Sequence, residues 1–320
     1  MSYTAAYVTG KVTIGLATLF VVSALVFVAL HFVPGSYTDV VVNPQASDLA
    51  RDNAARQYGL DKPLVVQFVL WLKQLLSGNL GVMMGTGQPI SELLGKRLPV
   101  TGELGLLATA FAALVGVPSA IAAGMAKSTI ACGSSRLIGA VAMSTPEFVL
   151  GSVLVYFFSR YSLGLPAGGY TPFPVDPIAN LRSMVLPVLT LGLLGVAMVI
   201  RTGRDAIAST LSLPHVTAAV ARGESTLRIV WHHVLRNAAI PIATVLATFV
   251  GSVLGGAVIV ENLFSVPGMG QAVLNGISRR DYAVVQGAVL VAAAAFIAVN
   301  MVADLAYGLI DPRVRMRPRA

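Results

Sequence analysis

Long apolar runs constrain this chain more than any other feature of its sequence. Six stretches are apolar over about the length that a helix needs to cross a bilayer, roughly 20 residues. They cover about residues 12–31, 104–126, 137–159, 183–202, 238–260 and 283–310, and the acidic residues within them are Glu147 and Asp304. Each run is therefore predicted to be a transmembrane helix.

The composition excludes a soluble protein. Hydrophobic residues make up 56% of the chain and charged residues 11%, whereas a soluble domain has about 25% charged residues. Such a chain cannot cover its surface with polar groups in water, so its surface must face lipid. We expect an all-α integral membrane protein, with residues 1–320 forming a single transmembrane domain.

Basic residues set the expected orientation of these helices. If the N-terminus is cytoplasmic, the predicted cytoplasmic segments hold twelve of the 22 Lys and Arg residues and are shorter than the external segments. The positive-inside rule favours that arrangement, so both termini are predicted to be cytoplasmic. The net charge of +8 is therefore interpreted as a topology signal first, ahead of a role in binding nucleic acid. This orientation predicts an external segment at residues 34–100 and a cytoplasmic hairpin at residues 205–239.

The sequence offers no catalytic or metal-binding constellation. The run most similar to a phosphate-binding loop, "ISELLGKR", has Ile90 and Arg97 where that motif needs a glycine and a hydroxyl residue. His232 and His233 are adjacent and would point in different directions on a helix, and Cys132 has no second cysteine to pair with. We therefore expect neither an enzyme nor a bound metal or cofactor.

A carboxylate inside a membrane span is costly and is therefore a candidate functional residue. Glu147 lies in "STPEFVLG" directly after Pro146, which frees a backbone carbonyl and tends to kink a helix. One hypothesis is that Ser144, Thr145 and Glu147 line a translocation path. The other is that Glu147 is a protonated or hydrogen-bonded packing residue. Asp304, near the cytoplasmic end of the last span, is interpreted as structural.

Two further patterns concern packing. Gly251 and Gly255 lie four residues apart, which would let another helix, from this chain or from a second subunit, approach the fifth span closely. In the external segment, "PLVVQFVLWLKQLLSG" has apolar residues at helical spacing and a stop signal at Gly78. That helix either lies on the membrane surface, with Trp71 near the headgroups, or packs on the helix bundle.

The cytoplasmic hairpin contains the most polar long stretch in the second half of the chain, "HVTAAVARGESTLRIVWHHVLRNAAIPI". Pro214 suits a first helical position, Gly223 suits the left-handed residue that ends a helix, and Ser225 can cap a second helix. The apolar stripe expected on that second helix is Leu227, Val230 or Trp231, Val234 and Ala238. A helix, a turn and a second helix are predicted, and the first helix could be inert or could dock into a groove on a soluble partner.

The hairpin resembles the "EAA" motif of permease subunits of ATP-binding cassette importers. That motif reads Glu-Ala-Ala, three residues, Gly, and nine residues later Ile-x-Leu-Pro. In this chain Thr217 stands for the Glu, Ala218 and Ala219 match, and Gly223 falls on the glycine. The run "HVLRN", followed by Pro241, is similar to the dipeptide, oligopeptide and nickel permease branch of that family.

Other stretches are similar to the same branch, and together they cover nearly the whole chain. They are "VSALVFVALHFVPG", "YGLDKPLVVQF", "GNLG", "STPEFVLG", "LPVLTLGL", "GGAVIVENLFSVPGMG" and "RDYAVVQGAVL" with "VNMVADLAYGLIDPRVR". The long first external segment is similar to that of the subunit usually called the B permease.

The resemblance implies a passive pore subunit of type I importer architecture in the bacterial inner membrane. The implied coupling helix fits a cleft on an ATP-binding subunit and involves His215, Thr217, Ala218, Ala219, Arg222, Gly223 and Glu224. The implied partners are a homologous permease, as a heterodimer or a homodimer, two cytoplasmic ATPase subunits that bind ATP and Mg, and an extracytoplasmic binding protein. ATP can bias such a pore only by binding the closed ATPase pair better than the open pair.

The resemblance favours peptides as the substrate, with nickel chelates, glutathione, sugars or opines as alternatives. A different class of hypothesis is an ion-coupled secondary transporter that uses Glu147. It would predict inverted repeats within the chain and activity without an ATPase. The two halves of the sequence have no obvious similarity, and neither that transporter nor a membrane anchor explains the hairpin together with the Pro and Gly pattern. The importer is therefore the favoured interpretation.

Overall fold

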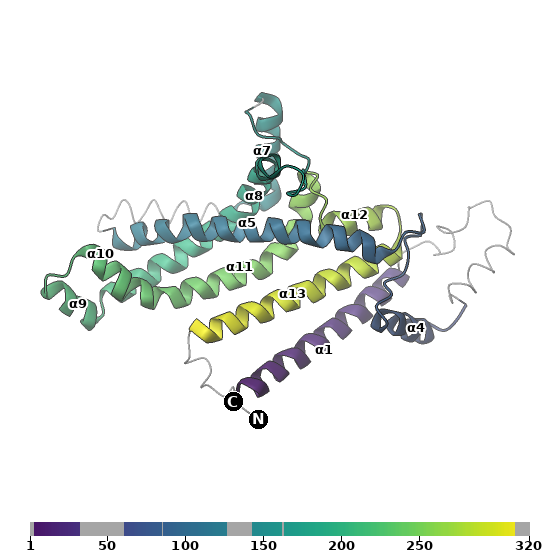
Figure 1. The fold of residues 1–320 in the computed structure, drawn as a ribbon, viewed down its shortest axis with the longest axis horizontal. Helices are drawn as coiled ribbons and strands as arrows, with labels where there is room; N and C mark the ends of the chain where they lie inside the picture. The colour runs from purple at the N-terminus through teal and green to yellow at the C-terminus, as the bar shows by residue number, and fades with distance from the viewer. Residues whose placement is uncertain (1–2, 33–60, 85, 127–142, 162, 311–320) are drawn as a thin grey trace. The chain divides into compact units, whose positions relative to one another are not determined.

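The chain is helical through most of the residues that the structure describes. The structure, a computed structural model, describes residues 3–32, 61–84, 86–126, 143–161 and 163–310 (Figure 1). Its helices are α1 (Tyr3–His31), α4 (Leu64–Leu76), α5 (Ile90–Met125), α7 (Glu147–Tyr161), α8 (Pro177–Leu211), α9 (Pro214–Ala221), α10 (Thr226–Ile229), the π-helical turn η1 (Val230–Val234), α11 (Leu235–Leu263), α12 (Met269–Ser278) and α13 (Tyr282–Ile310).

Five helical segments of the described residues are long and apolar enough to cross a membrane. They lie at Val8–Leu30, Ile90–Met125, Pro177–Leu211, Thr226–Val253 and Tyr282–Val302. These segments overlap five of the six predicted spans. The remaining prediction, residues 137–159, overlaps α7, which has 15 residues, and residues 137–142 lie outside the described residues.

The helices extend beyond the apolar runs of the sequence. Helix α5 begins at Ile90, well before the predicted start at residue 104. Helix α8 begins at Pro177, where the Oδ1 of Asp176 accepts hydrogen bonds from the backbone N–H groups of Ile178 and Ala179 at 2.9 and 3.0 Å. Proline suits this position because its missing N–H would have had no helical partner. Hydropathy finds the apolar part of a helix and does not predict such polar ends.

The chain divides into two compact units. One comprises Met1–Thr101 and Pro267–Ile297, and the other comprises Gly102–Val266 and Ala298–Ala320. In the first unit, Ile90 and Leu94 at the start of α5 form an apolar core with Met269 and Ala272 of α12 and with α13. Helix α1 lies close to α13, because a Cβ atom added at Gly15 would lie 2.8 Å from the side chain of Ile297.

In the first unit, polar side chains bind backbone N–H groups at the starts of α12 and α13. The carboxylate of the buried Asp281 accepts hydrogen bonds from the backbone N–H groups of Val284 at 3.1 Å and of Met84 at 2.9 Å. The Oγ1 of Thr101 accepts one from the backbone N–H of Met269 at 2.8 Å. These bonds satisfy buried groups and fix where both helices begin.

The predicted amphipathic helix of the external segment is α4, and Gly78 beyond its end has a φ of 79°. One face packs on α1: the ring centroid of Trp71 lies 5.7 Å from that of Phe27, and Phe68 lies 6.0 Å from Phe20. The opposite face exposes apolar side chains, including Val65, which is 74% exposed. Helix α4 therefore packs on another helix with one face and retains an apolar face that a membrane surface could cover.

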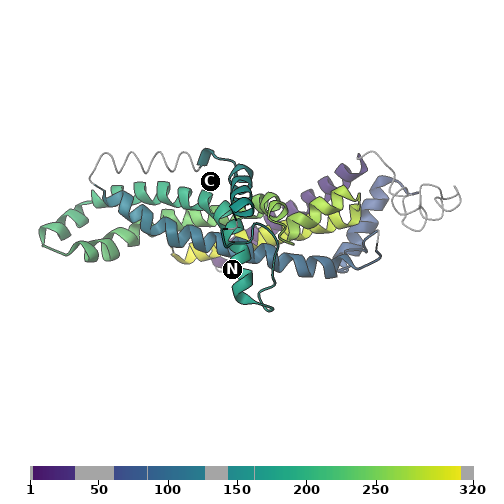
Figure 2. The same ribbon diagram turned by 90° about the horizontal axis from the view of Figure 1, so that it is seen from above.

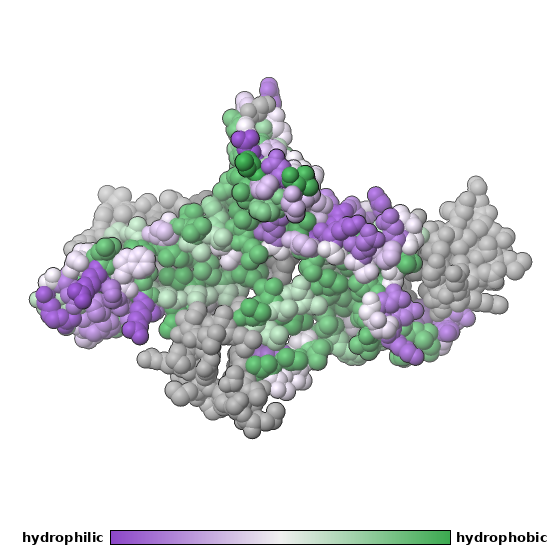
Figure 3. Space-filling model, viewed as in Figure 1, coloured by the Kyte–Doolittle hydropathy of each residue, from purple (hydrophilic) through white to green (hydrophobic). Residues whose placement is uncertain are grey.

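In the second unit, small residues let long helices lie close together. A Cβ atom added at Gly192 of α8 would lie 2.6 Å from Phe111 of α5, and one at Gly195 would lie 2.7 Å from Phe249 of α11. Leu106 and Leu114 on α5 are each 75% exposed. Figure 3 shows apolar side chains along the second unit's helices, as expected of surfaces that face lipid.

Candidate functional site

The polar hairpin of the sequence is a helical projection of the second unit. Figures 1 and 2 both show α9 at the end of α8 and α11, which approach it from the same side. Hydrophilic residues gather over this end of the unit (Figure 3). The hairpin therefore presents a short helix away from the apolar parts of α8 and α11.

Helix α9 ends in a Schellman turn centred on Gly223. The N–H of Gly223 donates to the carbonyl of Val220 at 2.9 Å, and the N–H of Glu224 donates to that of Ala219 at 3.2 Å. This pattern requires a left-handed residue, and the φ of Gly223 is 76°. The glycine expected to end the first helix of the hairpin therefore does so.

The two faces of α9 differ. Val216 and Ala219 are buried, at 1% and 0% exposure, in an apolar core with residues of α5, α8, η1 and α11. His215, Thr217 and Ala218 are exposed. Of the seven residues assigned to coupling from the sequence, Ala219 therefore anchors the helix, while the exposed ones are available to another molecule.

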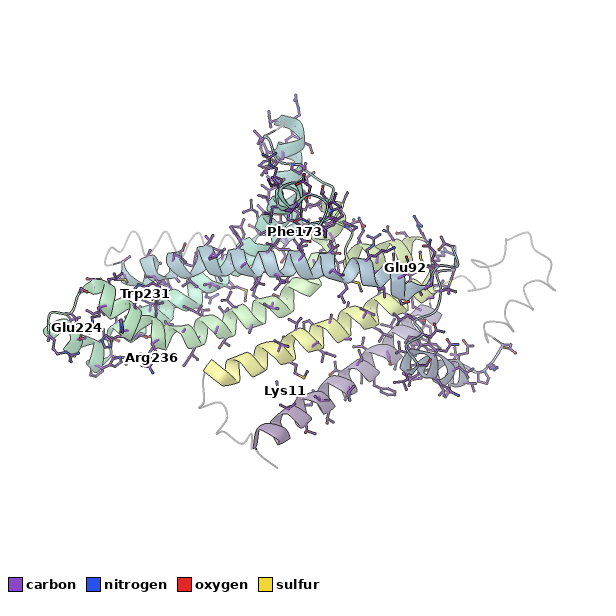
Figure 4. All side chains as sticks on the ribbon, viewed as in Figure 1. Lys11, Glu92, Phe173, Glu224, Trp231 and Arg236 are labelled. Carbon is purple, nitrogen blue, oxygen red and sulfur yellow. The ribbon has the colours of Figure 1, made fainter. Side chains whose placement is uncertain are left out.

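The carboxylate of Glu224 joins the turn to the following helix. One oxygen accepts a hydrogen bond from Arg222 Nη2 at 2.8 Å, and the other accepts one from His233 Nε2 at 3.2 Å. The rings of His215 and His233 lie 6.1 Å apart. The hydrogen bonds from Arg222 and then from His233 lower the pKa of Glu224, so its charged form is favoured. Figure 4 shows Glu224 at the end of the hairpin.

The second arm confirms the predicted apolar stripe except at Leu227. Val234, Ala238 and, of the two alternatives, Val230 are buried, whereas Trp231 is 63% and Leu227 70% exposed. The π-helical turn η1 lies between Leu227 and Leu235, and its extra residue shifts the phase of the helix there. Ser225 precedes α10 as predicted, but its side chain makes no cap hydrogen bond.

The candidate path residues lie at the start of α7. Ser144 and Thr145 are exposed, and Glu147, the first residue of α7, is half-buried. A Cβ atom added at Gly256 of α11 would lie 2.5 Å from Oε2 of Glu147. The residue that makes room is thus Gly256 and not Gly255, beside which there is open space. A close approach at Gly255 therefore stays a prediction for a helix of a second subunit.

Sequence reasoning missed a polar cluster between α5 and the segment before α8. The hydroxyl of Tyr170 donates to Oε2 of Glu103 at 2.9 Å, and Nδ2 of the buried Asn180 donates to the carbonyl of Thr171 at 2.9 Å. Burial and the bond to Glu103 raise the pKa of Tyr170 to about 12. Nothing in the spacing of these residues predicts that they meet.

Metal-binding geometry is absent from the part of the chain that the structure describes: no three His, Cys, Asp or Glu side chains come together there.

Two family models match the chain in adjacent segments. Residues 116–316 match the model described as binding-protein-dependent transport system inner membrane component. Residues 6–96 match the model of the N-terminal part of such a membrane component. The first match covers the hairpin and α7, and the second covers α1 and α4.

Similar proteins align over nearly their whole length. The probable peptide ABC transporter permease protein y4tP of Sinorhizobium fredii is 33% identical over 309 residues, which are 97% of this chain and 99% of that protein. The dipeptide transport system permease protein DppB of Alkalihalophilus pseudofirmus is 30% identical over 97% of this chain and 99% of its own. The glutathione transport system permease protein GsiC of Escherichia coli is 32% identical over 94% and 95% of the two chains.

The family matches, the full-length relatives and the apolar helices agree on one kind of molecule. The chain belongs to the family of inner membrane components of binding-protein-dependent transport systems: it is a multi-pass, non-catalytic ABC permease subunit of the bacterial inner membrane that works with ATP-binding and substrate-binding components.

Proposed function

We propose that this permease forms one half of the pore of an ATP-driven importer that moves peptides into the cytoplasm by alternating access. The peptide substrate is supported by the names of y4tP and DppB, which are a peptide and a dipeptide permease and each align over 97% of this chain. The observation that carries the ATP-driven part is the hairpin, which holds an exposed helical face at the end of two long helices.

The exposed face of α9 is the proposed docking surface for an ATPase subunit. His215, Thr217 and Ala218 are on that face, and Arg222 adds a basic group 60% exposed at the helix end. The buried Val216 and Ala219 fix α9 to its own unit, so a displacement of α9 would move α8 and α11 with it. ATP and Mg would bind the partner subunits and act here only through that displacement.

Ser144, Thr145 and Glu147 are the proposed polar lining of the path. Hydroxyls can exchange hydrogen bonds with peptide amides, and a carboxylate can accept them from the ammonium of a peptide N-terminus. Exposure of Ser144 and Thr145 at the start of α7 supports the assignment. Replacing Glu147 with Gln is expected to alter transport of cationic substrates and to leave assembly intact, and loss of the assembled complex would make Glu147 structural.

The proposed arrangement has six spans, cytoplasmic termini and a second, homologous permease that completes the pore as a heterodimer. The distribution of Lys and Arg along the sequence supports the orientation. In this orientation the hairpin faces the cytoplasm, on the side where ATPase subunits act.

Uptake by the reconstituted complex tests the proposed function. The permease pair, the ATPases and the binding protein are assembled in proteoliposomes, and labelled dipeptides, longer peptides and glutathione are supplied. We expect accumulation of peptides that requires both ATP and the binding protein. Accumulation of glutathione in place of other peptides would support the second candidate, which the similarity to GsiC favours. Uptake driven by an ion gradient without ATP would contradict the proposal.

A further inference from the structure

The run "HVLRN" lies where the hairpin joins α11. His233 and Val234 are the last residues of η1, and Leu235, Arg236 and Asn237 begin α11. These residues are not part of the exposed face of α9 that is proposed to dock. They nevertheless make defined packing and hydrogen-bond contacts.

Three of these residues make side-chain contacts that stabilise the junction between the hairpin and α11. The side chain of Val234, which is 0% exposed, packs in the core that anchors α9. The Nδ2 of Asn237 donates to the carbonyl of His233 at 3.0 Å. The Nε2 of His233 donates to Oε2 of Glu224 at 3.2 Å. The chain from the turn to α11 is therefore linked by side chains as well as by its backbone.

The π-helical turn gives this link its geometry. The N–H of Leu235 donates to the carbonyl of Val230, five residues earlier, so η1 contains one residue more than an α-helical turn. That residue sets the phase in which His233 contacts Glu224 while Val234 points into the core. The bond from Asn237 braces the carbonyl of His233 at the end of this turn.

The link from His233 reaches the end of α9 itself. Glu224 is the residue after Gly223, and its backbone N–H is bonded to Ala219 of α9 at 3.2 Å. Its other carboxylate oxygen is held by Arg222 at 2.8 Å. The side chains of His233 and Glu224 are 26% and 19% exposed, so water reaches the bond only in part. A continuous set of bonds therefore runs from α9 through Glu224 and His233 to Asn237.

We propose that His233 and Asn237 are positioning residues that pass a displacement of α9 to α11, with Glu224 as the link between them and the turn. The inference rests on the proposed role of α9 in coupling. A partly exposed pair contributes little to stability. Its removal can still change coupling between two sites, which is commonly worth about 5- to 150-fold in affinity.

The test uses the complete complex with its binding protein and measures how strongly the transported peptide stimulates ATP hydrolysis. His233→Leu and Asn237→Ala each remove one bond, Glu224→Leu removes the bonds to both His233 and Arg222, and His233→Gln keeps an amide donor. His232→Leu is the matched control, because His232 is the adjacent, exposed histidine and has no hydrogen-bond partner among the described residues. The double variant E224L/H233L measures whether the two residues act as one unit.

We expect stimulation to fall about threefold to tenfold in H233L, the range for loss of one partly exposed charged hydrogen bond. It should fall at least as far in E224L, which also loses the bond from Arg222. Stimulation should also fall in N237A and should match the wild type in H233Q and H232L, and the double variant should be no worse than E224L. Stimulation in H233L equal to that of the wild type would overturn the inference and leave the proposed function intact.

The controls distinguish failure of this inference from failure of the proposed function. A wild-type complex without stimulation would instead count against the proposed function. If H233L does not assemble, E224L decides, because Glu224 lies in a surface turn. Wild-type stimulation in an assembled E224L complex, or additive losses in the double variant, would overturn the link.

Discussion

The end of α9 depends on a single residue, Gly223. Its φ of 76° is unfavourable for other residues, and nothing lies within 4 Å of the position that a Cβ atom would take. The cost of Gly223→Val is therefore backbone strain, about 1–2 kcal/mol. We expect this variant to lose peptide-stimulated ATP hydrolysis in the reconstituted complex. Gly223→Asn is the control, because Asn tolerates this conformation. Unchanged stimulation in G223V would remove Gly223 from the coupling turn.

A second glycine makes room for a carboxylate. An alanine Cβ at Gly256 would lie 2.5 Å from Oε2 and 3.2 Å from Cδ of Glu147. Because these atoms are the far end of a flexible side chain, we expect Gly256→Ala to destabilise the purified protein by about 1 kcal/mol, the low end for overpacking, and the double variant E147A/G256A to recover the loss. Thermal unfolding in detergent measures both. Gly255→Ala is the matched control, with open space beside it, and a G256A protein as stable as G255A would contradict this packing.

The roles of these two glycines differ in how well the sequence predicts them. Gly223 could be predicted because it follows a helix-forming run and precedes Ser225, a residue type favoured at the start of a helix, so the evidence is local. Gly256 could not, because whether Gly255 or Gly256 faces α7 depends on the rotation of α11. That rotation is set by contacts with helices distant in the sequence.

A tyrosine ties the segment before α8 to α5 and gives a prediction for alkaline pH. Burial and the hydrogen bond to Glu103 raise the pKa of Tyr170 from 10.0 to about 12. A raised folded-state pKa means that this stabilisation is complete below pH 10 and is lost as the pH rises through 12. The melting temperature of the wild type should therefore fall more steeply over that interval than that of Tyr170→Phe. Tyr161→Phe, at an exposed tyrosine, should follow the wild type, and parallel curves for the wild type and Y170F would contradict the assignment.

The hairpin illustrates how far elements could be predicted. The helix, the turn and the second helix follow from Pro214, Gly223 and the apolar spacing. The phase of the second helix does not, since no local signal marks the π-helical turn at Val230–Val234. Leu227 was therefore expected in the apolar stripe but is exposed, and the spacing did not decide between Val230, which is buried, and Trp231, which is exposed. The bond between His233 and Glu224 likewise depends on that turn.

For the whole molecule, the composition and the apolar runs predict the membrane class, and the basic residues predict an orientation. These signals are strong because they summarise many residues. The packing of α7 with Gly256, and of Tyr170 with Glu103, joins parts of the chain 109 and 67 residues apart in the sequence. Hydropathy carries no information about such pairs.

Cross-linking from the exposed face of α9 measures whether this helix docks on an ATPase subunit. Ala218→Cys, in a chain whose Cys132 is replaced by Ser, carries a thiol-attached photo-crosslinker in the assembled complex. Val175→Cys is the control, because this residue is 75% exposed and lies between the predicted spans 137–159 and 183–202, on the external side if the N-terminus is cytoplasmic. We expect position 218 to cross-link to an ATPase subunit, with a yield that changes when ATP binds, and position 175 to form no such cross-link. A transporting complex in which position 218 never reaches an ATPase subunit would contradict this docking.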